Sequence, residues 1–543
     1  MAAAQSLRAR TGGPPGVARL RRRLAHVGRW LACVCLPCAA GLATSCGRGS
    51  ELSSATAVDA LPRLEPDYAG LVIPPNIAPL NFRVAEDVEA CVVRLSSAAG
   101  ATVEVDCPNA ECRIAPRDWR RVLAASAGQD ILYDVYGHRR DGSWVRYRRF
   151  SNAVAREPID PFIVYRQLVP NKQITTIRGV FQQSLETLER WPLVTGRDGT
   201  FQCYNCHTFH QHDPDRFMLH VRGSHAGTLL VMDGQMRKVD TQAPPMFRPL
   251  AYAFWHPDGR HLAATVNMYV GNFPATDTLY DFQGIEKRGD LAVYDAVSNT
   301  VHTTPSVFGP EFIETHPCWS PDGKYIYFAR CADHALLSYR DLDQFKSDLM
   351  RISCDVETYA WGAPEMVMEY SRLGKSCSFP VVSPDGRYVL HILADKGTYP
   401  ITERTSEVHL LDLTSGAHRN LDAVNSPLSE SFPRWSTNGR WISLVSNRGD
   451  GRSSLPYFAY FDTAGQAHKA FVLPQEDPTY YDTFTDTYNV LELVRGKVRL
   501  SPNELARGME LPAEKASFPD APQVDAQTSA TQRHVTQQAG GPR

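Results

Sequence analysis

The chain has 543 residues, of which 43% are hydrophobic and 21% charged, as expected for a globular protein that buries a core and is divided into several domains. Its formal net charge is −2, so it lacks the basic footprint of a nucleic-acid-binding protein. The 37 glycines and 38 prolines favour a turn-rich β fold over a helical one.

The N-terminal segment, residues 1–46, is predicted to be a signal peptide. The first 50 residues contain eight arginines and no acidic residue. Arg21, Arg22 and Arg23 precede a short apolar stretch over residues 30–46, which ends in small residues. This arrangement is typical of a signal peptide, whereas 17 residues make a short membrane span. We therefore expect the protein to be exported.

The run Ala43-Thr44-Ser45-Cys46 resembles a bacterial lipoprotein box, in which the cysteine becomes the lipidated first residue. The resemblance implies a lipid anchor at Cys46 as the one membrane attachment, and a periplasmic or outer-membrane-associated protein. Leucine is commoner where Ala43 stands, so a plain secretory signal and an uncleaved anchor remain alternatives. Residues 47–70 are small and polar and are predicted to be a linker.

Residues 71–165 contain short alternating strand patterns that predict a small β-sandwich. Within it, residues 131–150 are predicted to form a hairpin with Asp141-Gly142 as its turn. Cys107 and Cys112 are close enough to close a short loop by a disulfide in an oxidising compartment. We find no catalytic constellation in this domain and expect it to serve in spacing or docking.

Four similar stretches follow residue 250, each with a turn, a basic residue and an apolar strand. The turns are centred on Asp258, Asp322, Asp385 and Asn438. Each stretch is followed by a second signature of a strand, a turn and a return strand. A four-stranded unit repeated in series predicts a β-propeller.

The repeats, and above all WSPDGK at residues 319–324, resemble the PD40 repeats of TolB-like propellers. The resemblance implies an all-β chain: the N-terminal small β-sandwich, then a propeller of six blades over residues 166–505. The last blade would be closed by strands near residues 160–190 or near the C-terminus. Such propellers resemble partner-binding modules of the cell envelope, which implies a protein partner. Residues 506–543 are polar and are predicted to be disordered.

The run Cys203-Tyr204-Asn205-Cys206-His207 predicts a covalently bound haem c. Two thiols in this spacing add to the vinyl groups of the porphyrin, and the imidazole that follows binds the iron as an axial ligand. An alignment of Phe209 with Phe432 predicts a degenerate blade whose first strand begins just after this run. The insert over residues 203–207 would then lie at the mouth of the central channel.

The sequence offers several candidates for the sixth iron ligand. Met218 and His220 lie two apart on one predicted strand. His220 is the preferred distal candidate because a buried imidazole needs a partner, while Met218 aligns with core positions and is the weaker one. His210, His212, His225 and an open sixth position are the remaining alternatives.

Three other interpretations of the cysteine pair remain open. Zinc is one, because the two thiols and the nearby histidines supply enough ligands for a tetrahedral site. A redox dithiol is another, although no helix N-terminus is indicated there. The third is a structural disulfide, in which case the chain would be a protein-interaction scaffold.

Four segments together suggest a wider resemblance. PIDPFIVYR (158–166), CYNCHTF (203–209), DPDRFMLHVRG (213–223) and GTLLV (227–231) resemble a group of bacterial exported TolB-like propeller proteins with a cytochrome-c-type motif. The resemblance implies electron transfer or haem-dependent binding at the envelope, with a redox protein among the partners.

An enzyme is the second alternative. The sequence contains no Gly-x-Ser-x-Gly elbow, no His-Glu-x-x-His run and no phosphate loop, so no hydrolase or transferase is indicated. His316 aligns with Phe379 and Phe432, which places a polar residue near the propeller axis. His316 and Glu314 are therefore the candidates for a metal-dependent enzyme that uses channel-facing histidines.

Overall fold

The computed structural model describes residues 51–169, 177–195, 202–223, 225–242, 246, 248–274, 282–332, 339–397 and 399–519. The chain divides into a unit over residues 1–55 and a second over residues 56–543, and the architecture below is that of the second. The whole of the predicted signal peptide, residues 1–46 with Cys46, lies outside the described ranges. Among the helices that the structure describes, none has the length and apolar character needed to cross a bilayer.

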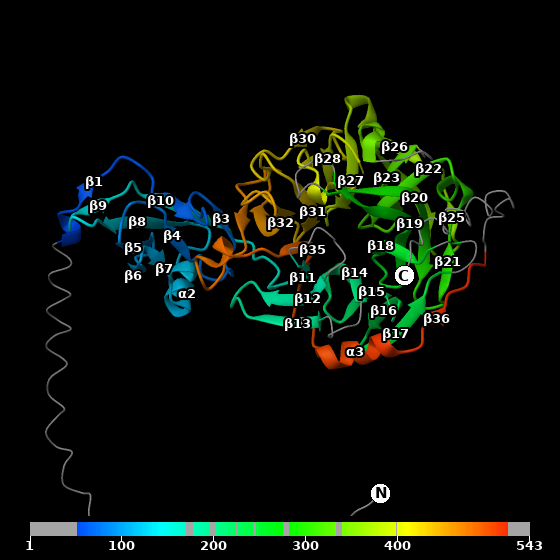
Figure 1. The fold of residues 1–543 in the computed structure, drawn as a ribbon, viewed down its shortest axis with the longest axis horizontal. Helices are drawn as coiled ribbons and strands as arrows, with labels where there is room; N and C mark the ends of the chain where they lie inside the picture. The colour runs from blue at the N-terminus through cyan, green and yellow to red at the C-terminus, as the bar shows by residue number, and fades with distance from the viewer. Residues whose placement is uncertain are drawn as a thin grey trace, which may run out of the picture. The chain divides into compact units, whose positions relative to one another are not determined.

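The N-terminal domain is built from two sheets and one helix, as predicted for a small β-sandwich (Figure 1). Its seven-stranded sheet contains β1 (Thr56–Ala57), β3 (Val72–Ile73), β5 (Ala90–Ser97), β6 (Thr102–Pro108), β8 (Asp130–His138), β9 (Trp144–Arg146) and β10 (Phe150–Val154). The second sheet contains β2 (Leu64–Glu65), β4 (Phe82–Val84) and β7 (Glu111–Cys112). Helix α2 (Pro116–Ala124) buries Trp119, whose indole N–H donates to the carbonyl of Ile77. The predicted hairpin is confirmed, because β8 and β9 are antiparallel and flank Gly142.

Six further sheets are the blades of a propeller, and their inner strands contact one another around the ring. Blade I contains β11 (Phe162–Leu168), β12 (Ile177–Ser184), β13 (Arg190–Thr195) and β35 (Thr487–Val494); blade II contains β14 (Gln202–Phe209), β15 (Arg216–Gly223), β16 (Gly227–Met232), β17 (Gln235–Asp240) and β36 (Glu514–Lys515); blade III contains β18 (Leu250–Trp255), β19 (His261–Pro274), β20 (Phe282–Asp295) and β21 (Thr300–His302).

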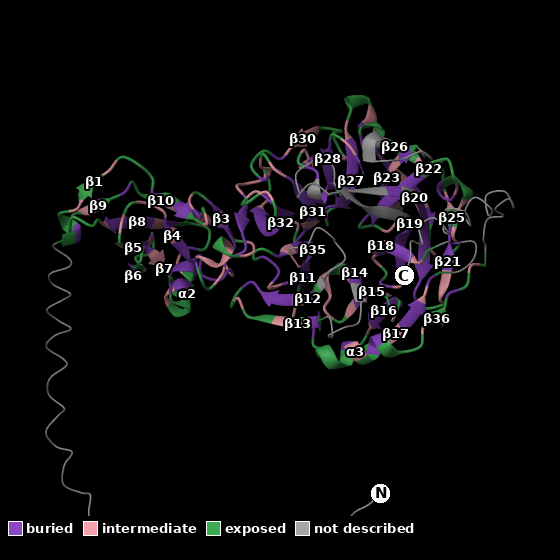
Figure 2. Cartoon of the chain, in the orientation of Figure 1, coloured by how far each residue is buried: buried purple, intermediate pink, exposed green. Residues whose placement is uncertain are grey.

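Blade IV contains β22 (Phe312–Trp319), β23 (Tyr325–Ala332), β24 (Asp348–Asp355), β25 (Ala360–Trp361) and β26 (Glu365–Met368); blade V contains β27 (Ser376–Val382), β28 (Tyr388–Ala394), β29 (Glu407–Asp412) and β30 (His418–Asn420); blade VI contains β31 (Glu430–Trp435), β32 (Trp441–Ser446), β33 (Leu455–Tyr460) and β34 (Phe471–Val472). Buried residues follow these strands, and exposed ones lie mainly in the connections (Figure 2).

Blade I closes the ring with strands from both ends of the propeller sequence. Strand β35 pairs antiparallel with β11, so the innermost strand comes from the C-terminal side and the three outer strands from the N-terminal side. This pairing satisfies the inner edge of β11, which would otherwise expose unpaired backbone groups. The predicted C-terminal closing strand is therefore present.

Five inner strands share one irregularity, a non-glycine residue with left-handed backbone geometry. The φ values are 49° at Tyr252, 54° at His316, 49° at Phe379, 52° at Phe432 and 48° at Val490, and the strand register shifts beside each of them. Such backbone is costly unless packing compensates. Here the rings pack across neighbouring blades: His316 stacks on Phe379 at 3.7 Å between ring centroids, and Phe379 meets Phe432 at 4.7 Å.

The four predicted Asp-Gly or Asn-Gly turns are all present between the first and second strands of their blades. Gly259, Gly323, Gly386 and Gly439 have φ values between 65° and 74°, a region that glycine occupies without strain. These turns confirm the repeat that the sequence indicated.

The domain boundaries differ from those expected in three places. The predicted linker over residues 47–70 includes β1 and β2, which pair with strands of the sandwich. The propeller begins at β11, before residue 166. The predicted tail over residues 506–543 includes the end of helix α3 (Pro502–Glu510) and strand β36, which pairs with β17. Strands of two residues are too short to produce a recognisable alternation in sequence.

Ring closure leads to a first prediction. Truncation after residue 486 removes β35 and everything beyond it, so blade I loses its inner strand and the ring stays open. We expect this variant to lose the cooperative thermal transition of the propeller in circular dichroism. Truncation after residue 519 removes only residues outside the described ranges and should move the transition by no more than about 2 °C. A truncation at 486 that unfolds like the full chain would contradict the assigned closure.

Candidate functional site

The Cys-x-x-Cys-His run lies within an inner strand, β14, rather than in front of one. Cys203 pairs with Arg222, Cys206 with His220 and His207 with Leu219 on β15. The register shifts between Tyr204 and Cys206, so the register shift that the other inner strands show falls in this run and not at Phe209. The alignment of Phe209 with Phe432 was therefore wrong.

The error has a physical source in the length of the β14–β15 hairpin. His220 follows the irregularity of β14 by about 15 residues, whereas the corresponding Leu444 follows Phe432 by 12. The extra residues include the short 3-10 turn His210–His212. The sequence alignment therefore matched β15 correctly and shifted β14 along the chain.

Cys206 and His207 occupy opposite faces of β14, because they are consecutive and pair without an irregularity between them. Cys206 packs against the apolar cluster that includes Met218 and Leu230. His207 lies on the other face near Phe209, and burial together with the charge of Arg166 lowers its pKa to about 3. The side chain of Cys203 lies outside the described ones. The Cys206 thiol and the His207 imidazole therefore point away from each other and do not converge on one porphyrin. This arrangement does not fit haem c, which stays a prediction from the sequence.

Most of the candidate sixth ligands pack in the core or form a hydrogen bond through one ring nitrogen, and the buried Nε2 of His220 has no hydrogen-bond partner among the described residues. Met218 is buried in the apolar cluster of blades II and III, as its alignment with core positions suggested. His220 is 1% exposed, with Nδ1 3.0 Å from the hydroxyl of Thr228. His210 and His212 bond the carbonyls of Pro257 and Leu493, and His225 lies half-buried after β15. In the part of the chain that the structure describes, no metal-ligand cluster includes any of these residues.

His316 lies in the central layer of rings, where the sequence placed it. Its ring stacks on Phe379 and meets the edge of Tyr252 at 4.6 Å between centroids. Glu314 instead pairs with Arg330 at 2.8 Å, and burial, opposed by Arg330, raises the pKa of this carboxyl to about 8. No described metal-ligand cluster contains His316 or Glu314.

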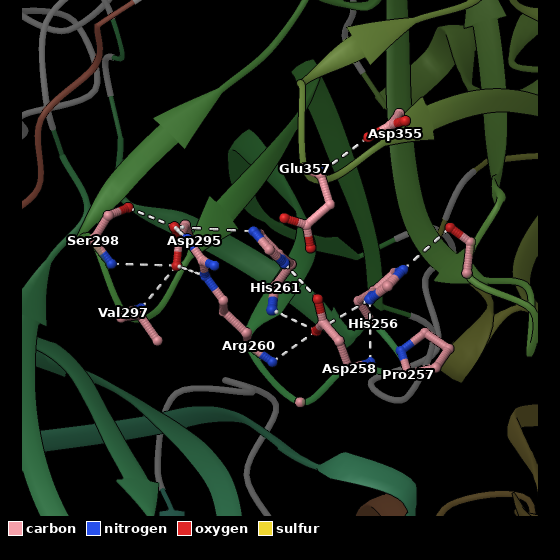
Figure 3. Close-up of polar contacts among 12 residues, drawn as sticks. His256, Pro257, Asp258, Arg260, His261, Asp295, Val297, Ser298, Asp355 and Glu357 are labelled. Carbon is pink, nitrogen blue, oxygen red and sulfur yellow. Dashed lines mark hydrogen bonds and ion pairs between the residues drawn. The ribbon is translucent and has the colours of Figure 1, made fainter.

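A different cluster brings three ligand groups together on one hairpin. His256, Asp258 and His261 lie in and beside the turn between β18 and β19 of blade III, and one ligand atom from each lies within 4.8 Å of the other two. It is the one such cluster among the residues that the structure describes. Figure 3 shows both imidazoles turned toward the Asp258 carboxylate.

The contacts within the cluster run through the same nitrogen of each ring. His261 Nδ1 lies 2.7 Å from Asp258 Oδ2, and His256 Nδ1 lies 3.1 Å from Asp258 Oδ1. Partial burial acts against ionisation, but the contact with His256 and the hydrogen bond from His261 hold the pKa of Asp258 well below its usual range. The carboxylate is therefore an anion that faces two Nδ1 atoms.

The outer nitrogen of each ring contacts an oxygen atom of blade IV. His256 Nε2 lies 3.1 Å from the carbonyl of Gly323, in the corresponding turn of blade IV. The backbone N–H of Asp258 donates to His256 Nδ1, so Nε2 carries the proton that Gly323 accepts. His261 Nε2 lies 3.3 Å from the Tyr359 hydroxyl. These contacts fix the ring orientations, as the outer partners of metal-ligating histidines do.

A second carboxylate, that of Asp295, lies behind His261, and its negative charge is paired with Arg260. Asp295 receives two hydrogen bonds from Arg260 and one from Tyr359. Although partial burial opposes it, the Arg260 and Ser298 hydrogen bonds hold the pKa of Asp295 below its usual range. Asp295 lies 3.9 Å from His261 Nε2, beyond hydrogen-bond distance, and is not one of the three ligands.

The turns of the other blades show what is special about this one. In blades IV, V and VI the first position is a serine whose hydroxyl donates to the turn residue, as from Ser320 to Asp322. The position matching His261 is Tyr325, Tyr388 or Trp441. Blade III therefore replaces serine and an aromatic residue with two histidines in one turn. Comparing HPDGRH with SPDGKY in sequence would have found this cluster, which the search for known motifs missed.

No protein-family model matches the chain, and no curated protein matches it. Among solved structures it is similar to a hypothetical selenium-binding protein from Sulfolobus tokodaii (9% identity, 67% of this chain and 97% of that one, TM-score 0.39). It is also similar to oligogalacturonate lyase from Vibrio parahaemolyticus (12%, 56% and 92%, 0.30) and to a periplasmic gluconolactonase from Pseudomonas aeruginosa (15%, 56% and 81%, 0.30). At these TM-scores the similarities carry no inference about activity, and the propeller rests on the sheet pairings.

The burial of His220 leads to a second prediction. Burial and then the charge of Arg222 lower its pKa from 6.5 to about 3, so the folded chain holds it neutral while the unfolded chain protonates it below about pH 6.5. Its contribution to stability is complete above that pH and is lost as pH falls toward 3. In urea unfolding, lowering the pH from 7 to 4.5 should reduce the free energy of unfolding of the wild type by about 2 to 3 kcal/mol more than that of His220→Leu. Met218→Leu on the same strand should keep the wild-type pH dependence, and equal slopes for all three proteins would contradict the assignment.

Proposed function

We propose that this chain is an exported β-propeller that binds one divalent transition-metal ion at His256, Asp258 and His261. The convergence of two Nδ1 atoms on one ionised carboxylate, with both outer nitrogens in contact with oxygen atoms of blade IV, is the observation that carries the proposal. The ion would lie between the three groups and replace the hydrogen bond from His261 to Asp258.

The donor set narrows the class of ion. Two imidazoles and one carboxylate suit Zn²⁺, Fe²⁺, Co²⁺, Ni²⁺ or Mn²⁺, whereas Ca²⁺ and Mg²⁺ prefer sets made of oxygen alone. Three protein ligands leave at least one coordination position for water or for a group from another molecule. Asp258 retains 29% of its side-chain exposure while His261 has 0%, so the open position faces solvent on the Asp258 side.

The site suits a binding role on a scaffold. It spans two blades, because His256 contacts Gly323 and His261 contacts Tyr359, both from blade IV. An ion here would tie blade III to blade IV and present an exchangeable position to a protein partner in the envelope. A carboxylate or imidazole from that partner is the kind of ligand that would complete the coordination.

Export and lipid anchoring at Cys46 belong to the same proposal. They are supported by the arginine-rich, acid-free N-terminus, the apolar stretch that follows and the Ala-Thr-Ser-Cys run. Fractionation of the producing cells, with mass spectrometry of the mature N-terminus, tests both. A diacylated Cys46 is expected, and an unprocessed cytoplasmic chain would contradict both.

The metal site gives the third prediction. The chelator-treated full chain should bind one Co²⁺ or Zn²⁺ per molecule in calorimetry, and the Co²⁺ complex should show visible absorption bands. His256→Ser with His261→Tyr restores the residues found in blade V, so the double variant should fold normally and lose at least about a hundredfold in affinity, as expected when two of three ligands are removed.

The matched control is His468→Ala, which removes a histidine that faces only one carboxylate, Asp462. It should leave the affinity unchanged. Binding that is equal in the wild type and the double variant, or that is absent from both, would overturn the proposed site. Thermal unfolding of each variant separates a lost ligand from a lost fold.

A further inference from the structure

Three buried cysteines meet in the core of the sandwich domain, far in sequence from the proposed metal site. Cys91, Cys107 and Cys112 have exposed fractions of 1%, 1% and 0%, and all three are thiols. Cys91 on β5 and Cys107 on β6 are direct antiparallel partners. The Cys107 thiol also contacts that of Cys112, so it is the central member of the group.

The backbone geometry permits a disulfide between Cys91 and Cys107. Directly opposed residues of antiparallel strands have Cα atoms about 4.5 to 5.5 Å apart, which falls within the range of about 4.4 to 6.8 Å that disulfides span. The bond would close a loop from β5 to β6 inside the seven-stranded sheet.

The third thiol belongs to the other sheet of the sandwich. Cys112 lies on β7 and pairs with Phe82 of β4. A bond from Cys107 to Cys91 therefore lies within one sheet, whereas a bond from Cys107 to Cys112 joins the two sheets. The choice of partner at Cys107 decides which of these connections the domain has.

We propose that these cysteines form a redox-active thiol group in which Cys107 forms a disulfide with Cys91, and Cys112 can displace Cys91 from it. Two thiols and one molecule of glutathione disulfide give the protein disulfide and two molecules of glutathione. In the exchange, the Cys112 thiolate attacks Cys107 sulfur, and Cys91 leaves as the thiolate and takes up a proton. The number of disulfides does not change in that second step.

Burial controls when this chemistry takes place. Contact with Cys107 first, and burial second, raise the pKa of Cys91, and contact with Cys112 raises that of Cys107. Because the thiolate is the reacting form, the folded domain reacts slowly. Oxidation and exchange belong to folding or to opening of the sandwich.

The test uses the full chain, reduced in urea and refolded into a mixture of reduced and oxidised glutathione. Remaining thiols are alkylated in acid-quenched urea, and the linked peptides are mapped by mass spectrometry. We expect a Cys91–Cys107 link with Cys112 alkylated, and in Cys91→Ser a Cys107–Cys112 link. Cys377→Ser, which removes a buried thiol of blade V, should leave the wild-type map unchanged.

Three alkylated thiols in the wild type, or a link that omits Cys107, would overturn the proposal. So would a Cys91→Ser protein that folds and contains no link. If Cys91→Ser does not fold, the wild-type map alone decides on the disulfide. Cys107→Ser, which should contain no link among the remaining two thiols, then decides whether Cys107 is the shared atom.

Discussion

The antiparallel pairing of β11 with β35 is the interaction on which the rest of the propeller depends. A ring of sheets is stable only when its first and last elements meet, since each blade buries its two faces against its neighbours. Here the meeting is made by backbone hydrogen bonds inside one sheet. Once the ring is closed, every inner strand is held at the centre, and the rings of His316, Phe379 and Phe432 pack across the blades.

The metal-ligand cluster lies in a turn that the closed ring repeats from blade to blade. Turns between the first and second strands repeat around the ring, and in blades IV, V and VI a serine hydroxyl and an Asp or Asn complete them. Blade III keeps the aspartate and changes the residues on both sides of it to histidine. The scaffold supplies the backbone geometry, the Gly323 carbonyl and the Tyr359 hydroxyl. Two substitutions on that scaffold are enough to create a set of three ligands.

Much of the architecture follows from the sequence by elementary reasoning. The Asp-Gly turns, the return strands and the hairpin at Asp141-Gly142 are local features, and all are present as predicted. Blade II was misaligned because the longer hairpin between Asn205 and His220 changes the register without changing the pattern of apolar residues. The edges of the domains were misjudged because β1, β2 and β36 are two-residue strands whose partners lie far along the chain.

The candidate sites were harder to predict because side-chain direction depends on pairing. Cys206 and His207 match a known pentapeptide, but in a paired strand consecutive side chains point apart. In a helix, residues three apart such as Cys203 and Cys206 would share one face, and His207 would lie about 100° from Cys206. His256 and His261 match no familiar motif, and only the comparison of one turn with its repeats makes them conspicuous. For repeat proteins, departures from the internal consensus are therefore more informative than resemblance to external motifs.

The chain does not stop where the ring closes, and this has a mechanical consequence. After β35 it continues through α3 to β36, which pairs with β17 of blade II, and Ser517 then bridges to Thr300 of blade III. Residues 514–517 thus pair with the outer strands of two blades, beyond the seam. Tension applied at the C-terminus would load the pairing of β36 with β17 before it reached β35, so this pairing shields the seam of the ring from a pull on that end of the chain.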